Sequence, residues 1–247
     1  SVSCLTTAPH WPTHSKWLKS FQTQVDLGLH FNLTEGKPIS LAYRQRYGES
    51  FFPLSRLISQ AFLRKLDEAV LQAECQAQLD CFISILGFLP DFIDGHQHIH
   101  QLPQVRKALL QVYERSLRDK KVYLRSVARM VKGRDFGTAL KQKLIYCCGA
   151  LGFQKLLKQE AIPHNTDFAG VYSFSEAVAY PRILQHFLEN IKDKGLIMCH
   201  PALEQKRSSK DPIAFARVQE YNYLASEDFA RACHTLGIQL HQFSYRA

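Results

Sequence analysis

Short apolar segments alternate with helical patterns along the chain, and this alternation constrains the fold more than any other feature. Strand-like segments occur at residues 2–6, 25–33, 91–94, 121–127, 196–200 and 238–243. Apolar residues at three-to-four spacing predict helices at 55–86, 103–117, 181–195 and 226–237, and they predict that the range 138–159 is helical in parts. Strands separated by helices usually pair in parallel, so the sequence predicts an α/β fold. No Gly-rich phosphate loop follows the first strand, which favours an irregular (β/α) TIM-like barrel over a doubly wound sheet.

Several residues predict where the helices begin and end. Ser55 is the expected N-cap of a long helix that Gly87 ends. Gly195 is expected to end the helix before a buried strand at 196–200, and Ser226 to cap the last helix. Internal repeats and linkers rich in Pro, Gly or Ser are missing from the sequence. We therefore expect a single domain over residues 1–247.

Composition limits the partners and the compartment. The 31 Lys and Arg against 22 Asp and Glu give a net charge of +9, which suits an anionic partner but is also common in soluble enzymes. No nucleic-acid motif accompanies the charge, so no nucleic-acid partner is expected. The longest apolar run, 81–89, is too short to span a bilayer, so no membrane association is expected either. The odd number of cysteines, seven without a CxxC pair, indicates reduced thiols in a cytoplasmic protein.

Three histidines at a spacing of two follow Asp94 directly: His96, His98 and His100. In an extended segment side chains two apart point the same way, so all three rings and Asp94 would face one side. Such a cluster is typical of a metal site or a catalytic site, although a polar strand end has the same spacing.

Three other expected strands carry polar groups near their carboxyl ends, namely His30, Arg125 and His200. In parallel barrels the chemistry lies at the carboxyl ends of the strands, so we expect these groups to converge with the histidine triplet on one rim. A single histidine in a strand more often packs than binds a ligand, and a histidine before a proline can simply end a strand. Their interpretation as site residues therefore depends on whether their side chains converge on the same rim.

Taken together, these segments resemble the YdjC-like carbohydrate deacetylase family, which includes the chitooligosaccharide deacetylases. The family's Gly-x-His-x-x-Leu-Thr, Asp-Ser-His-x-His-x-His and Cys-His-Pro segments are matched, with Gly95 in place of the serine, at Gly28, His30, Leu33 and Thr34, at Asp94, His96, His98 and His100, and at Cys199, His200 and Pro201. Their order and approximate spacing agree over most of the chain.

The resemblance implies a hydrolase that removes acetyl groups from N-acetylated sugars or chitooligosaccharides by metal-activated water. One divalent ion, Mg²⁺ or Zn²⁺, would be held by His30, His96 and an aspartate of the family's first strand. His98 and His100 would then orient His96 or line the pocket, as residues in contact with metal ligands commonly do.

Further roles follow for the remaining polar groups. The leaving amine must be protonated, and His200 is our candidate for this general acid. Arg125 would hold a carboxyl, phosphate or sugar hydroxyl, or tune a neighbouring carboxylate. Asp94 is expected to bind substrate or to support a metal ligand.

The chain departs from the family pattern in one respect. The family's first strand carries paired aspartates followed by Phe-Gly, and the only similar stretch here, residues 134–137, has one aspartate between helices. The resemblance therefore implies that a βα unit of roughly 30 residues before Ser1 is missing, either from a fragment or from a truncated gene product.

Two functions remain open in consequence. The first is the metal-dependent deacetylase, with little activity and weak metal binding expected from these 247 residues alone. The alternative is a non-catalytic carbohydrate- or metal-binding protein. The sequence leaves the sugar, the metal and the oligomeric state undecided, a homodimer being one option.

Overall fold

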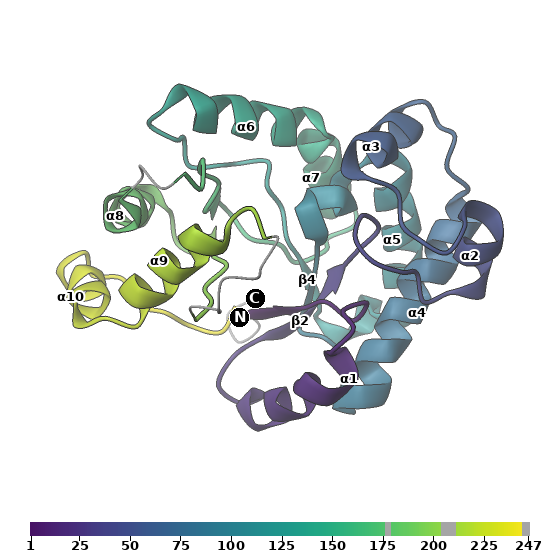
Figure 1. Ribbon diagram of the computed structural model, residues 1–247, viewed down its shortest axis with the longest axis horizontal. Coiled ribbons are helices and arrows are strands. Elements are labelled where there is room, and N and C mark those ends of the chain that lie inside the picture. The colour runs from purple at the N-terminus through teal and green to yellow at the C-terminus, as the bar shows by residue number, and fades with distance from the viewer. Residues whose placement is uncertain (176–178, 204–210, 244–247) are drawn as a thin grey trace. The chain divides into compact units, whose positions relative to one another are not determined.

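The computed structural model describes residues 1–175, 179–203 and 211–243 (Figure 1). The chain divides into two compact units. Unit 1 contains Ser1–Ser126, Cys147–His164 and the stretch from Gln242 onward, and unit 2 contains Val127–Tyr146 and Asn165–His241.

Unit 1 is built on a four-stranded, wholly parallel sheet in the order β1-β2-β3-β4. Its strands are β1 (Val2–Cys4), β2 (Leu27–Phe31), β3 (Phe92–Gly95) and β4 (Tyr123–Leu124). The register pairs His30 with Asp94. Side chains of neighbouring residues on adjacent strands point to the same face of a sheet, so this register places the two polar side chains next to each other at the carboxyl ends of the strands.

The helices of unit 1 cover the sheet with leucine-rich faces. They are α1 (Trp11–His14), α2 (Leu41–Tyr47), α3 (Leu54–Phe62), α4 (Glu68–Leu86), α5 (Pro103–Ser116) and α7 (Ala150–Gln159), with 3₁₀ segments η1 (Ser15–Phe21), η2 (His96–Gln101) and η3 (Arg118–Lys120). Figure 1 shows α4 and α5 side by side, and Leu79 and Phe82 of α4 and Leu109 of α5 are fully buried in one core cluster. The same cluster contains Leu29 of β2 and Ile93 of β3, so the helices bury apolar side chains of the sheet.

The single long helix predicted for 55–86 is wrong, because two helices fill this range. Ser55 lies inside α3, whose N-cap is Pro53. The chain turns at Arg64, where φ is +57°, and restarts at Asp67, whose carboxylate accepts the backbone N–H groups of Ala69 and Val70. Periodicity alone did not reveal this break, since apolar residues continue through it. The predicted end is confirmed: α4 stops at Gly87, in the left-handed conformation.

The described residues of unit 2 form a two-stranded parallel sheet and four helices. They are β5 (Phe168–Ala169), β6 (Leu196–Ile197), α6 (Phe136–Cys147), α8 (Tyr180–Asn190), α9 (Ala214–Leu224) and α10 (Glu227–Thr235). Met130 adds a parallel bridge to Phe168. Aromatic and aliphatic side chains of α8, with Tyr172, form the centre of its core.

Several boundaries in this half of the chain differ from the sequence-based expectation. The range 138–159, predicted to be helical in parts, contains two helices, α6 and α7, separated by Gly149 at φ +113°. The buried strand predicted for 196–200 is only the two-residue β6, which is half-buried. Residues 238–243, predicted to be a strand, do not form one. Helix α8 ends at Asn190 rather than at Gly195. Ser226 does cap α10, as predicted, by accepting the N–H of Phe229.

The predicted mixed α/β class with parallel strands is confirmed, and closure into a barrel stays a prediction. All seven cysteines are free thiols. Among the described residues, the helices are all too short or too polar to cross a lipid bilayer.

Candidate functional site

The three clustered histidines lie on a tight turn rather than on the extended segment predicted for them. Strand β3 ends at Gly95, and the next residues form the 3₁₀ segment η2. Inside it Gln97 and His98 have φ of +51° and +60°, which reverses the chain. The expectation that all three rings face one side is therefore wrong, because alternation of side chains holds only in extended backbone. His96 is partly exposed, whereas His98 and His100 point inward and are buried.

His30 and Asp94, paired across β2 and β3, form the centre of the site. The Nδ1 of His30 lies 2.6 Å from Asp94 Oδ1, and the other carboxylate oxygen contacts Arg125 Nη1 at 2.5 Å. Ser3 donates to the same oxygen at 3.0 Å. Burial alone would raise the pKa of Asp94, but the charges of Arg125 and His30 outweigh it and hold this pKa well below its usual range. Asp94 is therefore ionised and accepts the Nδ1 proton of His30.

The other nitrogen of His30 faces His96. His30 Nε2 and His96 Nδ1 are 3.2 Å apart, and the rings meet edge to face with centroids 5.3 Å apart. Two nitrogens that bind one ion at about 2.1 Å each lie no more than about 4.2 Å apart, so this pair fits a shared metal ion. The expected approach of the two rings is thus observed. The described part of the chain contains no group of three or more His, Cys, Asp or Glu side chains placed to hold an ion.

His98 and His100 contact Arg125 instead of His96. His100 Nε2 donates to the backbone oxygen of Arg125 at 2.9 Å, and His98 Nδ1 lies 3.3 Å from Arg125 Nη2. Burial, and then the charge of Arg125, lower the pKa of His100 to about 3 and that of His98 well below its usual range. Both rings are therefore neutral, and they hold the arginine that contacts Asp94.

Gly95, which replaces the serine of the family pattern, lies directly under His100. A Cβ at this position would come within 2.5 Å of His100 Nδ1. The glycine therefore lets the ring pack against the strand end, where a larger residue would displace it.

The sequence-based list of site residues omitted Glu35. Its Oε1 lies 3.2 Å from Nε2 of His96 and 3.4 Å from Nε2 of Gln97. A signal was present, because Glu35 follows β2 by only four residues and loops after strand ends carry site residues in parallel sheets.

His200 follows β6 in unit 2, and its main chain is held by helix α9. Its backbone N–H donates to Glu220, and its carbonyl accepts from Arg217 Nη1 at 3.3 Å. Glu220 is buried and also accepts the hydroxyl of Tyr172 at 2.7 Å; burial raises its pKa. The ring of His200 meets Phe174 edge to face at 5.6 Å. Convergence of His200 with the histidine pair of unit 1 stays a prediction.

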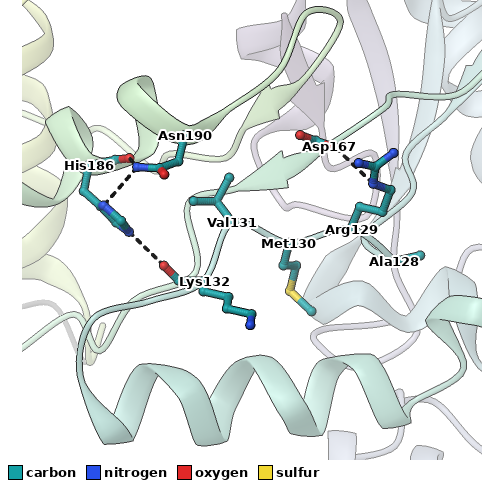
Figure 2. A pocket seen from close by; sticks show the side chains of 8 residues that line it. All are labelled: Ala128, Arg129, Met130, Val131, Lys132, Asp167, His186 and Asn190. Carbon is teal, nitrogen blue, oxygen red and sulfur yellow. Dashed lines mark hydrogen bonds and ion pairs between the residues drawn. The ribbon is translucent and has the colours of Figure 1, made fainter.

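Unit 2 also has a surface pocket of about 440 Å³ beside the Met130 bridge (Figure 2). His186 Nε2 donates to the backbone oxygen of Lys132 at 2.9 Å, and Arg129 Nε lies 3.4 Å from Asp167 Oδ1. None of the site residues predicted from the sequence lines this pocket.

Comparison with known proteins points to one family. The sequence pattern of the YdjC-like protein family matches residues 1–235. A chitooligosaccharide deacetylase of Yersinia enterocolitica is 23% identical over 94% of this chain and 82% of its own length. The human carbohydrate deacetylase is 38% identical over 97 residues, which are 36% of this chain and 30% of that protein. The matches to the vertebrate relatives span less than a third of their length.

A solved structure shares the fold. It is a protein of Enterococcus faecalis V583 provisionally described as a cellobiose-phosphate cleavage protein, with a TM-score of 0.71 and 20% identity. The match covers 99% of this chain and 87% of that one.

Proposed function

Because the chain belongs to the YdjC-like protein family, we propose that it is a metal-dependent carbohydrate deacetylase that releases acetate from N-acetylated sugars. Relatives named chitooligosaccharide deacetylase and carbohydrate deacetylase support this reaction class. The observation that carries the metal dependence is the 3.2 Å approach of His30 Nε2 and His96 Nδ1 at the carboxyl ends of two parallel strands.

His30 and His96 would hold one divalent ion. Bound there, the ion would lower the pKa of a water molecule and polarise the acetamide carbonyl. Imidazole nitrogens suit Zn²⁺ well, whereas Mg²⁺ prefers oxygen ligands, so Zn²⁺ is the first ion to test.

Asp94 and Arg125 prepare His30 for this role. Asp94 accepts the Nδ1 proton and so directs the lone pair of Nε2 toward His96. Arg125 in turn donates through Nη2 to the backbone oxygen of Gly95 at 2.8 Å and pairs with Asp94 through Nη1. One arginine thereby holds the end of β3, and Asp94 extends this support to His30 on β2.

His200 is proposed as the general acid that protonates the leaving amine. An imidazole supplies a pKa near neutral pH without special burial. A metal ligand must keep its lone pair, so acid and ligands must be different histidines. The anchoring of the His200 main chain by Glu220 and Arg217 supports a fixed position for its ring.

A non-catalytic metal- or carbohydrate-binding protein is the second candidate. It is favoured by the count of ligands, because the described residues present two converging histidines without a third side chain.

Acetate release from N-acetylglucosamine oligomers separates these two functions. The assay compares the 247-residue chain with a chain in which the family's aspartate-bearing strand precedes Ser1, each with Zn²⁺, with Mg²⁺ and with EDTA. We expect metal-dependent release from the extended chain and little from the shorter one. Absence of release from both would leave the binding protein as the better account.

The proposal also covers the fold, the domain organisation, the compartment and the oligomeric state. The two sheets would be parts of one irregular barrel in a single domain, as the resemblance implies. The seven free thiols support a reducing cytoplasm as the compartment. A homodimer is the oligomer to test.

A further inference from the structure

The loop that carries Glu35 is fixed from within the core. Asn32 is fully buried, and its side-chain oxygen accepts the backbone N–H groups of Thr34 and Glu35 at 3.0 and 3.2 Å. The amide nitrogen of Asn32 donates back to the carbonyl of Glu35 at 2.7 Å. Both main-chain polar groups of Glu35 are therefore bound by one buried side chain.

This bracing continues into helix α4. Gln78 accepts the backbone N–H of Asn32 at 3.0 Å and donates to its carbonyl at 2.7 Å and to Glu74 at 2.8 Å. Glu74 accepts the N–H groups of Ile39 and Ser40 at 3.0 and 2.8 Å. Asn32, Gln78 and Glu74 are all fully buried. Burying polar side chains is costly unless they are hydrogen-bonded, and these three satisfy one another while their hydrogen bonds hold the backbone of one surface loop.

The supported loop presents the Glu35 carboxylate to His96. The side chain of Glu35 is 59% exposed, and its Oε1 lies 3.2 Å from His96 Nε2. That nitrogen is shut off from solvent and has no aligned hydrogen bond among the described residues, so the carboxylate of Glu35 approaches it as an ion-pair contact. An ionised carboxylate only accepts, and it repels a ring lone pair. Glu35 therefore favours the tautomer of His96 with the proton on Nε2 and the lone pair on Nδ1.

The same arrangement exists on the other side of the pair, where Asp94 takes the Nδ1 proton of His30. The two remaining lone pairs then face each other across 3.2 Å, which is favourable only with a cation or a shared proton between them. We propose that Glu35 is a positioning residue, the exposed counterpart of Asp94, which orients His96 toward the ion. This inference rests on the proposed function, because it assigns Glu35 a task at the same metal site.

The first test needs no metal. Long-range ¹H–¹⁵N spectra of the metal-stripped 247-residue chain report which ring nitrogen of His96 carries the proton. We expect the population protonated at Nε2 to fall in Glu35→Ala, because Nδ1 can then donate to His30 Nε2. The control is Glu49→Ala, which removes an exposed glutamate of the loop after α2 and should leave the spectrum unchanged.

The second test is Zn²⁺ affinity, measured by calorimetry on the same variants. Loss of a carboxylate that orients a ligand typically weakens metal binding by about 10–100-fold, and we expect this from Glu35→Ala but not from Glu49→Ala. Glu35→Gln, which keeps a neutral acceptor of the same size, should give a smaller loss. Circular dichroism checks that each variant is folded, which the retained Asn32 contacts predict.

The outcomes distinguish failure of the role proposed for Glu35 from failure of the proposed metal site. Unchanged tautomer populations together with unchanged Zn²⁺ affinity in Glu35→Ala would overturn the role of Glu35 while leaving the histidine pair intact. A loss as complete as that of His96→Ala would also overturn it, since Glu35 would then be a ligand. If His96→Ala binds Zn²⁺ as the wild type does, the metal proposal fails, and the tautomer spectra alone decide the role of Glu35.

Discussion

The two regions that carry the predicted site residues hold their histidines in different ways. In unit 1 the ring of His30 is fixed by the carboxylate of Asp94, which Arg125 holds in turn. In unit 2 the contacts with α9 fix the main chain of His200, while its ring meets the edge of Phe174.

This difference matches the different chemical tasks proposed for the two regions. A metal ligand must keep one tautomer, and a carboxylate on its far nitrogen enforces it. A proton donor must exchange its proton in each cycle, and the contacts with α9 hold the main chain of His200 without using its ring nitrogens. The contrast therefore predicts that substitutions in unit 1 affect metal binding and stability, whereas substitution of His200 affects turnover.

The largest effect is expected at His200. Replacement by alanine should lower kcat by roughly 10²–10⁴-fold in a form of the protein that deacetylates, because the leaving amine loses its proton donor. Zn²⁺ content should stay unchanged. Acetate release and metal analysis on the same preparations measure both quantities.

His234→Ala is the matched control, since this exposed histidine of α10 lies in the same unit. Full activity of His200→Ala would refute the acid role, and loss of its metal would make His200 a ligand instead.

Arg125→Met tests the buried network of unit 1. Removing one partner of a buried ion pair leaves an uncompensated charge, here on Asp94, and typically costs about 3–5 kcal/mol in the free energy of unfolding. Urea unfolding in EDTA measures it. Arg46→Met, at an exposed position of α2, should change this free energy by less than about 0.5 kcal/mol. A similar small change for Arg125→Met would contradict the ion-pair account.

The smallest effect, counted per pH unit, concerns the buried ring of His100. Its pKa is about 3 in the folded chain and about 6.5 in the unfolded one, so between these values the unfolded state binds more protons. Stability should therefore fall as the pH falls through this window, by up to about 1.4 kcal/mol per pH unit from this group. Unfolding curves at several pH values should show a shallower slope for His100→Asn, but not for His14→Asn, an exposed position of α1. If the free energy of unfolding of His100→Asn and of the wild type depended equally on pH, the neutral, buried state of the His100 ring would be contradicted.

The sequence predicted the parallel sheet of unit 1 well, and for a physical reason. The apolar strands around His30 and Asp94 are bounded by clear changes of composition, and the α4 end at Gly87 and the Ser226 cap follow from local chemistry. Unit 2 was harder, because strands of two residues, such as β5, leave almost no periodic signal.

The sequence predicted which residues belong to the site better than it predicted how their side chains are arranged. Spacing suggested that His96, His98 and His100 act together, yet the left-handed residues of η2 send their rings in different directions. Conformations with positive φ at non-glycine residues are set by tertiary contacts and are not visible in the sequence. Glu35 was missed for another reason: its position shortly after β2 was a signal, but its place over His96 depends on the buried side chain of Asn32.

The central claim is that His30 and His96 bind one divalent ion together. Calorimetric titration of the metal-stripped chain with Zn²⁺ tests it most directly, with His30→Ala, His96→Ala and the control His234→Ala alongside. The account predicts one ion per chain for the wild type and the control, and loss of that binding in both His30→Ala and His96→Ala. Binding of Zn²⁺ by either of these two variants with the wild-type stoichiometry and affinity would contradict it.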